Sequence, residues 1–249
     1  MRRKNAWTTY NKKQLDELEK LCKNYLKFLD KGKTERECVK QIVKQAEEKG
    51  YVNLADITKD KKALKAGDKV YSVCMDKTVA LFQIGKKKLE KGMNILGAHI
   101  DSPRMDVKQN PLYESEEFAY LDTHYYGGIK KYQWVTLPLA LHGVVVKKDG
   151  TVITVNVGED KNDPVFCVTD LLIHLAGEQM EKKANKVIEG ENLDVLVGSK
   201  PLEGKEKDAV KEGILEILKE KYDMTEEDFM SAETVSYTHL RAHETLANL

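Results

Sequence analysis

The stretch Met93–Ala98 (MNILGA) constrains the fold most strongly, because it is a short run that is apolar on both faces. Such a strand needs cover on both sides, which is typical of the central strand of an α/β sheet. We therefore expect an α/β fold in which helices pack against the sheet that contains this strand.

The residues before this run supply the expected helices and further strands. Leucines, Cys22 and Tyr25 recur at spacings of three and four over residues 12–30, which predicts an amphipathic helix. Thr34-Glu35-Arg36-Glu37 is a capping box that opens a second helix, ending near Gly50. Two short β-rich runs, 69–75 and 78–84, flank Asp76-Lys77 and predict a hairpin.

The pattern changes after Pro103, where turn dipeptides such as Asp149-Gly150 punctuate the chain at short intervals. Strands are expected within 134–146 and at 151–157, with a hairpin turn at Asp149-Gly150. Helices are expected from Asp170 and over 206–222, and Thr225 is expected to cap a further turn. We place a boundary near residue 105, between an α/β unit (1–105) and a β-rich module with helices (106–233).

Composition excludes several classes of protein. The chain has 249 residues with 41 basic and 41 acidic side chains, and this zero net charge argues against a nucleic-acid-binding protein. No apolar run approaches the roughly 20 residues that span a bilayer, so no membrane association is expected. The basic start lacks the apolar core of a signal peptide. Four scattered cysteines form no paired motif, which favours a reducing, cytoplasmic location.

The last residues differ abruptly in composition from the rest. Val235–Thr245 (VSYTHLRAHET) resembles the translated read-through of a sequencing adapter, so we expect a non-native tail over 234–249 and exclude it from the fold. His239 and His243 lie four residues apart, a spacing that can share a metal on a helix. However, Glu244 follows the second histidine instead of the first, so the zincin pattern is absent.

His99-Ile100-Asp101 closes the apolar strand and supplies the residue types of a metal site. Residues i and i+2 of a strand point to the same side, so Asp101 can support the ring of His99 while that ring binds a metal. Open α/β sheets place their ligands at this end of a strand. The tripeptide alone also fits a histidine that is merely hydrogen-bonded within the structure.

A longer set of strings resembles one family. GAHIDSPRMDVK, THYYGGIKKYQWV (123–135), GEDKNDPVF (158–166) and DLLIHL (170–175) are similar, in this order, to the aspartyl aminopeptidase / aminopeptidase I family of dinuclear zinc exopeptidases. The resemblance runs from about Trp7 to Glu233. It implies a zinc-peptidase α/β domain interrupted by a β-rich dimerisation domain, which would begin near the boundary at 105.

The resemblance also implies roles for three residues. His99 matches the first zinc ligand of the family, and Asp101 matches the carboxylate that orients it. His174 matches a histidine that the inserted domain sends into the active site of a neighbouring subunit, where it would bind substrate; alternatively it only packs at an interface. His124 and His142 have no partner pattern and are interpreted as structural.

Two departures limit what the resemblance carries over. Trp134 is followed by Val-Thr-Leu-Pro instead of the aromatic-Asp-Arg string of the aspartyl branch, so the acidic preference of that branch is not implied. The family's bridging aspartate, general base and remaining ligands would all lie beyond this chain. We expect a parent protein that uses two zinc ions to remove N-terminal residues from peptides, and a chain that is inactive by itself.

Two other interpretations stay open at this point. A related zinc hydrolase, such as a deacylase or carboxypeptidase, would share His-X-Asp, although not the strings at 123–135 and 170–175. Alternatively, residues 106–233 form a homo-oligomeric module without chemistry.

Overall fold

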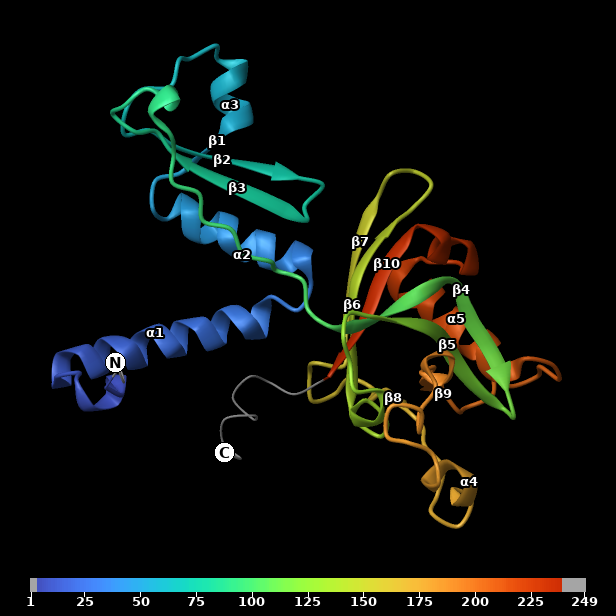
Figure 1. The fold of residues 1–249 in the computed structure, drawn as a ribbon. Helices are drawn as coiled ribbons and strands as arrows, with labels where there is room; N and C mark the ends of the chain where they lie inside the picture. The colour runs from blue at the N-terminus through green and yellow to red at the C-terminus, as the bar shows by residue number, and fades with distance from the viewer. Residues whose placement is uncertain (1–3, 239–249) are drawn as a thin grey trace. The chain divides into compact units, whose positions relative to one another are not determined.

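The computed structural model describes residues 4–238 and divides into two compact units between Asp101 and Ser102 (Figure 1). This division lies four residues before the predicted boundary at 105. None of the described helices is long and apolar enough to cross a membrane.

The first unit combines helices with a small sheet. Its elements are η1 (Ala6–Thr8), α1 (Lys12–Lys31), α2 (Glu35–Glu47), β1 (Val52–Asn53), α3 (Leu54–Lys59), β2 (Lys69–Cys74), β3 (Thr78–Gln83) and η2 (Leu89–Lys91). The sheet has the order β1-β2-β3, with β1 parallel to β2 and β3 antiparallel to it.

Both predicted N-terminal helices are present, and local capping explains where they begin. Thr34 and Glu37 form the predicted capping box at the start of α2, and Asn11 caps α1 in the same way. The inner face of α2 buries Cys38, Val39 and Ala46. The Tyr71 hydroxyl of β2 donates to Glu47 at 2.7 Å, and this bond raises the pKa of Tyr71.

The predicted β2–β3 hairpin is also present. Lys77 N donates to Cys74 O at 3.0 Å, and Met75 and Asp76 both have positive φ angles. Left-handed residues at a hairpin turn match the right-handed twist of the strands, which explains why this short connection is tolerated.

The predicted strand at Met93–Ala98 does not form. This segment has no regular secondary structure, and the Leu96 side chain is 100% exposed. A central strand needs neighbours for its backbone hydrogen bonds, and the described residues supply none, because β1, β2 and β3 pair only with one another.

The second unit is built on one seven-stranded sheet in the order β7-β6-β10-β4-β5-β9-β8. The strands are β4 (Arg104–Ser115), β5 (Phe118–Tyr126), β6 (Leu139–Val146), β7 (Val152–Val157), β8 (Cys167–Val168), β9 (Val195–Gly198) and β10 (Ala232–Thr238). The helices are η3 (Lys131–Gln133), α4 (Gly177–Met180), η4 (Gly190–Asn192), α5 (Ala209–Tyr222) and η5 (Glu226–Ser231). The predicted β6–β7 hairpin, the long helix and the Thr225 cap are all confirmed.

The sheet curls and its edge at β8 is bridged back toward β6. Val168 bridges to Val135, and Phe166 bridges to Leu139 at the start of β6. The enclosed core contains Met105, Leu139, Leu193 and Val195, all fully buried.

Helix α5 packs onto this core through Val210 and Ile214. A Cβ at Gly198 of β9 would lie 2.8 Å from Ile214 Cδ1, so glycine there permits the close approach of the helix. The helix begins at Asp208, which has a φ of 48° and provides no side-chain cap. Instead, Glu114 Oε2 of β4 accepts from Val210 N and Lys211 N at 2.8 Å each.

The helix predicted from Asp170 is reduced to the single turn α4. Residues 171–175 are irregular and exposed. Amphipathic helices owe most of their stability to packing of the apolar face, and no described core covers this run. Gly177 further lowers the helix propensity.

The start of the predicted non-native tail takes part in the sheet, which differs from our expectation for 234–249. Val235 lies opposite His142 of β6 and Asp106 of β4, and both Val235 and Ser236 are buried. A strand is held by backbone groups that every residue carries, and Val, Tyr and Thr favour extended structure. The foreign origin of these residues stays a prediction, and His239 and His243 lie outside the described residues.

Candidate functional site

His99 and Asp101 meet as the sequence predicts, although the strand that was expected to carry them is absent. His99 Nδ1 lies 3.1 Å from Asp101 Oδ1 and 3.2 Å from the Asp101 carbonyl oxygen. The His99 side chain is 85% exposed and that of Asp101 is 37% exposed. The contact therefore forms within three residues that have no regular secondary structure and needs no sheet around it.

The geometry of this pair suits one ligand of a metal site. Both groups near Nδ1 are acceptors, so Nδ1 carries the proton and Nε2 keeps its lone pair. A carboxylate behind the first nitrogen of a histidine is the usual way in which a metal-binding ring is oriented. The pair thus fits a zinc ligand with its supporting carboxylate.

The described residues do not complete a metal site. A catalytic zinc needs about three protein ligands. Between residues 4 and 238, no group of three histidine, cysteine, aspartate or glutamate side chains is placed to hold an ion. His99 is therefore one ligand in this part of the chain and not a full centre.

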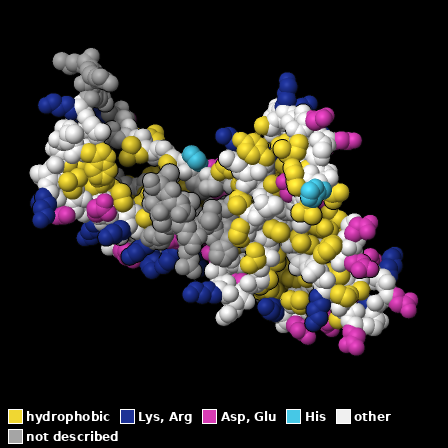
Figure 2. Space-filling model, turned by 90° about the horizontal axis from the view of Figure 1, so that it is seen from below, with side chains coloured by type: hydrophobic (Ala, Val, Ile, Leu, Met, Phe, Trp, Pro, Cys, Tyr) yellow, Lys and Arg dark blue, Asp and Glu magenta, His cyan; other side chains and the backbone are white. Residues whose placement is uncertain are grey.

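His174 lies in the second unit, in the irregular segment before α4. Its neighbours Leu172, Ile173 and Leu175 are strongly exposed, and exposed apolar side chains are common on the face shown in Figure 2. The expected helix would have placed His174 on one of its faces. In the structure His174 lies in an irregular loop, and the path of that loop alone sets its position.

The two histidines interpreted as structural have different surroundings. His142 of β6 is 3% exposed, and its Nε2 lies 3.1 Å from Glu159 Oε1. His124 of β5 is exposed, with Nδ1 at 3.9 Å from Glu191. Burial with a carboxylate partner makes His142 a paired core residue, as a structural role requires.

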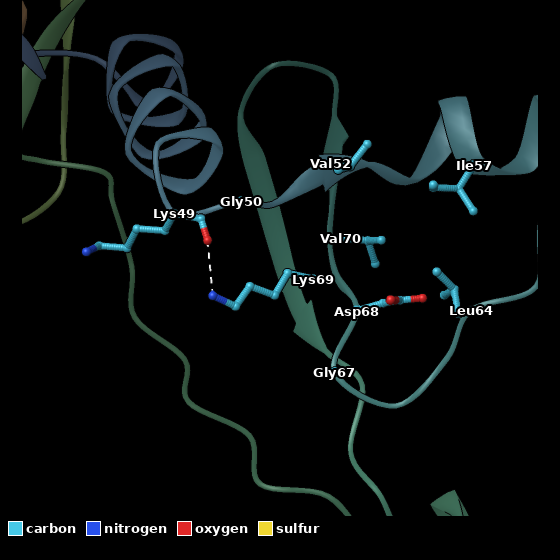
Figure 3. Close-up of a pocket in the computed structure, with 9 residues that line it drawn as sticks. All are labelled: Lys49, Gly50, Val52, Ile57, Leu64, Gly67, Asp68, Lys69 and Val70. Atoms are coloured by element: carbon cyan, nitrogen blue, oxygen red, sulfur yellow. Dashed lines mark hydrogen bonds between the residues drawn. The ribbon is translucent and has the colours of Figure 1, made fainter.

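A hollow of about 430 Å³ lies in the first unit, lined by the residues labelled in Figure 3. Two of its polar side chains bond to the backbone: Lys69 Nζ donates to Lys49 O at 3.0 Å, and Asp68 accepts from Lys65 N at 2.7 Å. Val52, Ile57, Leu64 and Val70 add aliphatic surface. His99 and Asp101 are not among the lining residues, so this hollow is separate from the candidate zinc ligand.

Sequence reasoning missed one polar cluster between β4 and the segment before β9. The Tyr113 hydroxyl donates to Asp194 at 2.6 Å, and Tyr120 stacks on Tyr113 with ring centroids 5.5 Å apart. Burial raises the pKa of both Tyr113 and Asp194. These residues are distant in the chain and share no motif, so only the strand pairing brings them together.

Comparison with known proteins extends the likeness over most of the chain. The sequence model of the family described as aminopeptidase I zinc metalloprotease (M18) matches residues 28–244. A probable M18 family aminopeptidase 1 from Clostridium acetobutylicum is 61% identical over 231 residues, which are 92% of this chain and 50% of that protein. The crystal structure of an M18 aminopeptidase from Thermotoga maritima has a TM-score of 0.89 and 44% identity, covering 97% of this chain and 51% of that chain.

A more distant structure shares the fold alone. The mApe1 dodecamer of S. cerevisiae has a TM-score of 0.62 with 17% identity, covering 90% of this chain and 49% of that one. The predicted mixed α/β architecture is thus confirmed by solved structures. In every one of these comparisons the chain spans about half the length of the protein it matches.

Proposed function

Because this chain belongs to the M18 family of aminopeptidase I zinc metalloproteases, we propose that it supplies part of the active site of a cytoplasmic aminopeptidase. The whole protein would release N-terminal amino acids from peptides. The observation that carries the proposal is the His99–Asp101 contact of 3.1 Å, which occurs in the string that resembles the family signature.

Each of the two residues has a definite task in this proposal. His99 binds zinc through Nε2, and Asp101 fixes the ring by accepting the proton of Nδ1. When bound, zinc polarises a peptide carbonyl and lowers the pKa of a bound water to about 7. The other ligands, the second zinc ion and the general base would come from residues outside this chain, so the chain alone should lack peptidase activity.

The second unit is proposed to bring copies of the protein together. Residues 106–233 would form the homo-oligomer contact, and His174 would bind substrate in the active site of a neighbouring copy. The exposed position of His174 among apolar side chains supports such a contact. A reducing compartment agrees with the four free cysteines, two of which are exposed.

The alternative zinc hydrolases, a deacylase or a carboxypeptidase, have no separate observation in their favour. The family match covers the strings at 123–135 and 170–175, which discriminate against them. A purely self-associating module would not account for the contact between His99 and Asp101.

The test is a chimaera in which residues 1–234 are fused to the half of the Clostridium acetobutylicum relative that this chain does not match. We expect zinc-dependent release of N-terminal residues from aminoacyl p-nitroanilides. Asp101→Asn should lower the rate about 10- to 100-fold, and His99→Ala should lower it at least as much. His124→Ala is the matched control, because it removes an exposed histidine that has no proposed role. A His99→Ala chimaera as active as its parent would overturn the proposal.

A further inference from the structure

The outer edge of β7 is the one long strand edge of the second unit that lacks a partner within residues 4–238. The order of the sheet places β7 at one end and β8 at the other. The β8 edge is only two residues long and is bridged to Val135 and Leu139. The β6–β7 hairpin instead extends from the sheet, and no strand among the described residues pairs with the outer edge of β7 (Figure 1).

The backbone groups that face outward on β7 follow from its register with β6. Lys147 N donates to Thr151 O at 2.8 Å, and Val146 lies opposite Val152. Hydrogen-bonded pairs alternate along an antiparallel ladder. Ile153 and Val155 therefore bond to β6, while the N–H and C=O groups of Val152, Thr154 and Asn156 point away from the sheet.

This edge carries none of the usual features that prevent strand pairing. Thr151–Val157 (TVITVNV) contains no charge and no proline, and six of its seven residues are β-branched. Natural sheets protect such edges with lysine, proline or bulges. An edge of this composition is suited to pairing with another strand.

The symmetry of a self-contact indicates that the partner runs antiparallel. A contact between the same edge of two copies is isologous, and a two-fold axis perpendicular to the sheet runs the two β7 strands in opposite directions. The other sheet edge is closed, so the pairing stops at two copies instead of continuing into a fibre.

We propose that β7 pairs antiparallel with β7 of a second copy of this chain, centred on Thr154. This deepens the proposed self-association by naming the surface, and it rests on that proposal. In this register Thr154 faces Thr154 of the second copy and Val152 faces Asn156, so only outward groups are used. Centring on Val155 would instead require Gly158 N, which already donates to Asp163 at 2.8 Å.

Sedimentation velocity over a concentration series tests the pairing in the intact chain. Thr154→Pro removes an outward N–H and no β6 ladder bond, so it should weaken dimerisation about tenfold or more. Thr154→Val is the matched control, because it keeps the N–H and should dimerise as the parent does. Thermal midpoints of both variants establish that the fold is kept.

Cross-linking tests the register without relying on proline. In a chain with exposed Cys22 and Cys74 replaced by Ser, Thr154→Cys should form an intermolecular disulfide, because facing Cα atoms lie about 5.5 Å apart. Asn156→Cys should not, because its counterpart lies four residues further along. Equal cross-linking at both positions would refute the pairing.

The two proposals fail in different ways. A parent chain that is monomeric at every concentration overturns both the self-association and its β7 surface. Dimers that persist in Thr154→Pro, with no cross-link at Thr154→Cys, overturn only the β7 surface and leave another part of 106–233 as the contact.

Discussion

The cap of α5 by Glu114 gives the most direct test of the packing in the second unit. We expect Glu114→Ala to destabilise this unit by about 2 kcal/mol. Two observations set this magnitude. The carboxylate accepts two backbone N–H groups at 2.8 Å, and Asp208 offers no side-chain cap of its own. Val210 is also 1% exposed, so solvent is poorly placed to replace the lost acceptor.

The contributions of this cap can be separated. Loss of a cap costs about 1 kcal/mol, and a charge near a helix N-terminus adds roughly 0.3–1 kcal/mol. A buried N–H left without a partner costs about 1–3 kcal/mol and overlaps with the first contribution. Glu114→Gln keeps an acceptor oxygen without the charge, so it should lose less than half as much stability as Glu114→Ala.

Two measurements follow this change in the intact chain. Calorimetry should show a fall of about 4–8 °C in the thermal midpoint of the second unit. Hydrogen exchange should be fastest at the first turn of α5. Glu216→Ala, at an exposed position of the same helix, is the control and should shift stability by less than about 0.5 kcal/mol. Unchanged exchange at Val210 and Lys211 in Glu114→Ala would refute the role of the cap.

Three further outcomes are expected. Gly143→Ala should displace β10 and destabilise the second unit by about 1–3 kcal/mol, because the new Cβ would lie 2.2 Å from Glu233 O; a calorimetric midpoint equal to the parent's would contradict this. Glu116 and Glu117 both have positive φ angles in the β4–β5 turn, so replacing them by Asn-Gly should stabilise the second unit by about 1 kcal/mol. Thermal melts measure this change, and a lower midpoint would count against the reasoning. Hydrogen bonds from Lys147 and Lys219 lower the pKa of Asp223 from 3.8 to about 2, so the stability that these bonds provide is complete above pH 4 and is lost as the pH falls through 2. The difference in urea midpoint between the parent and Asp223→Asn should therefore shrink over that interval. A constant difference would exclude the mechanism.

Local sequence signals predicted the elements that depend on near neighbours. The capping box at Thr34 and Glu37, the hairpin at Asp149-Gly150 and the contact of His99 with Asp101 all form between residues a few positions apart. Their hydrogen bonds need no distant partner. For the same reason the His99–Asp101 contact could be predicted even though the strand before it is absent.

Elements that depend on distant partners could not be predicted in this way. Ile95 and Leu96 have the composition of a central strand, but no described strand lies beside them. Leu171–Leu175 has the composition of a packed helix, but no described core covers it. Val235 shows the converse. The sequence predicts that it lies outside the fold, but it pairs with both β4 and β6.

The position of β10 between β6 and β4 has a consequence for the order of folding. The β4–β5 and β6–β7 hairpins can each form soon after synthesis, because their strands are consecutive in the chain. The ladder between the two hairpins, however, waits for Ala232–Thr238, the last strand described. Until those residues leave the ribosome, the facing edges of β4 and β6 stay unpaired, and a nascent chain is most exposed to aggregation during that interval.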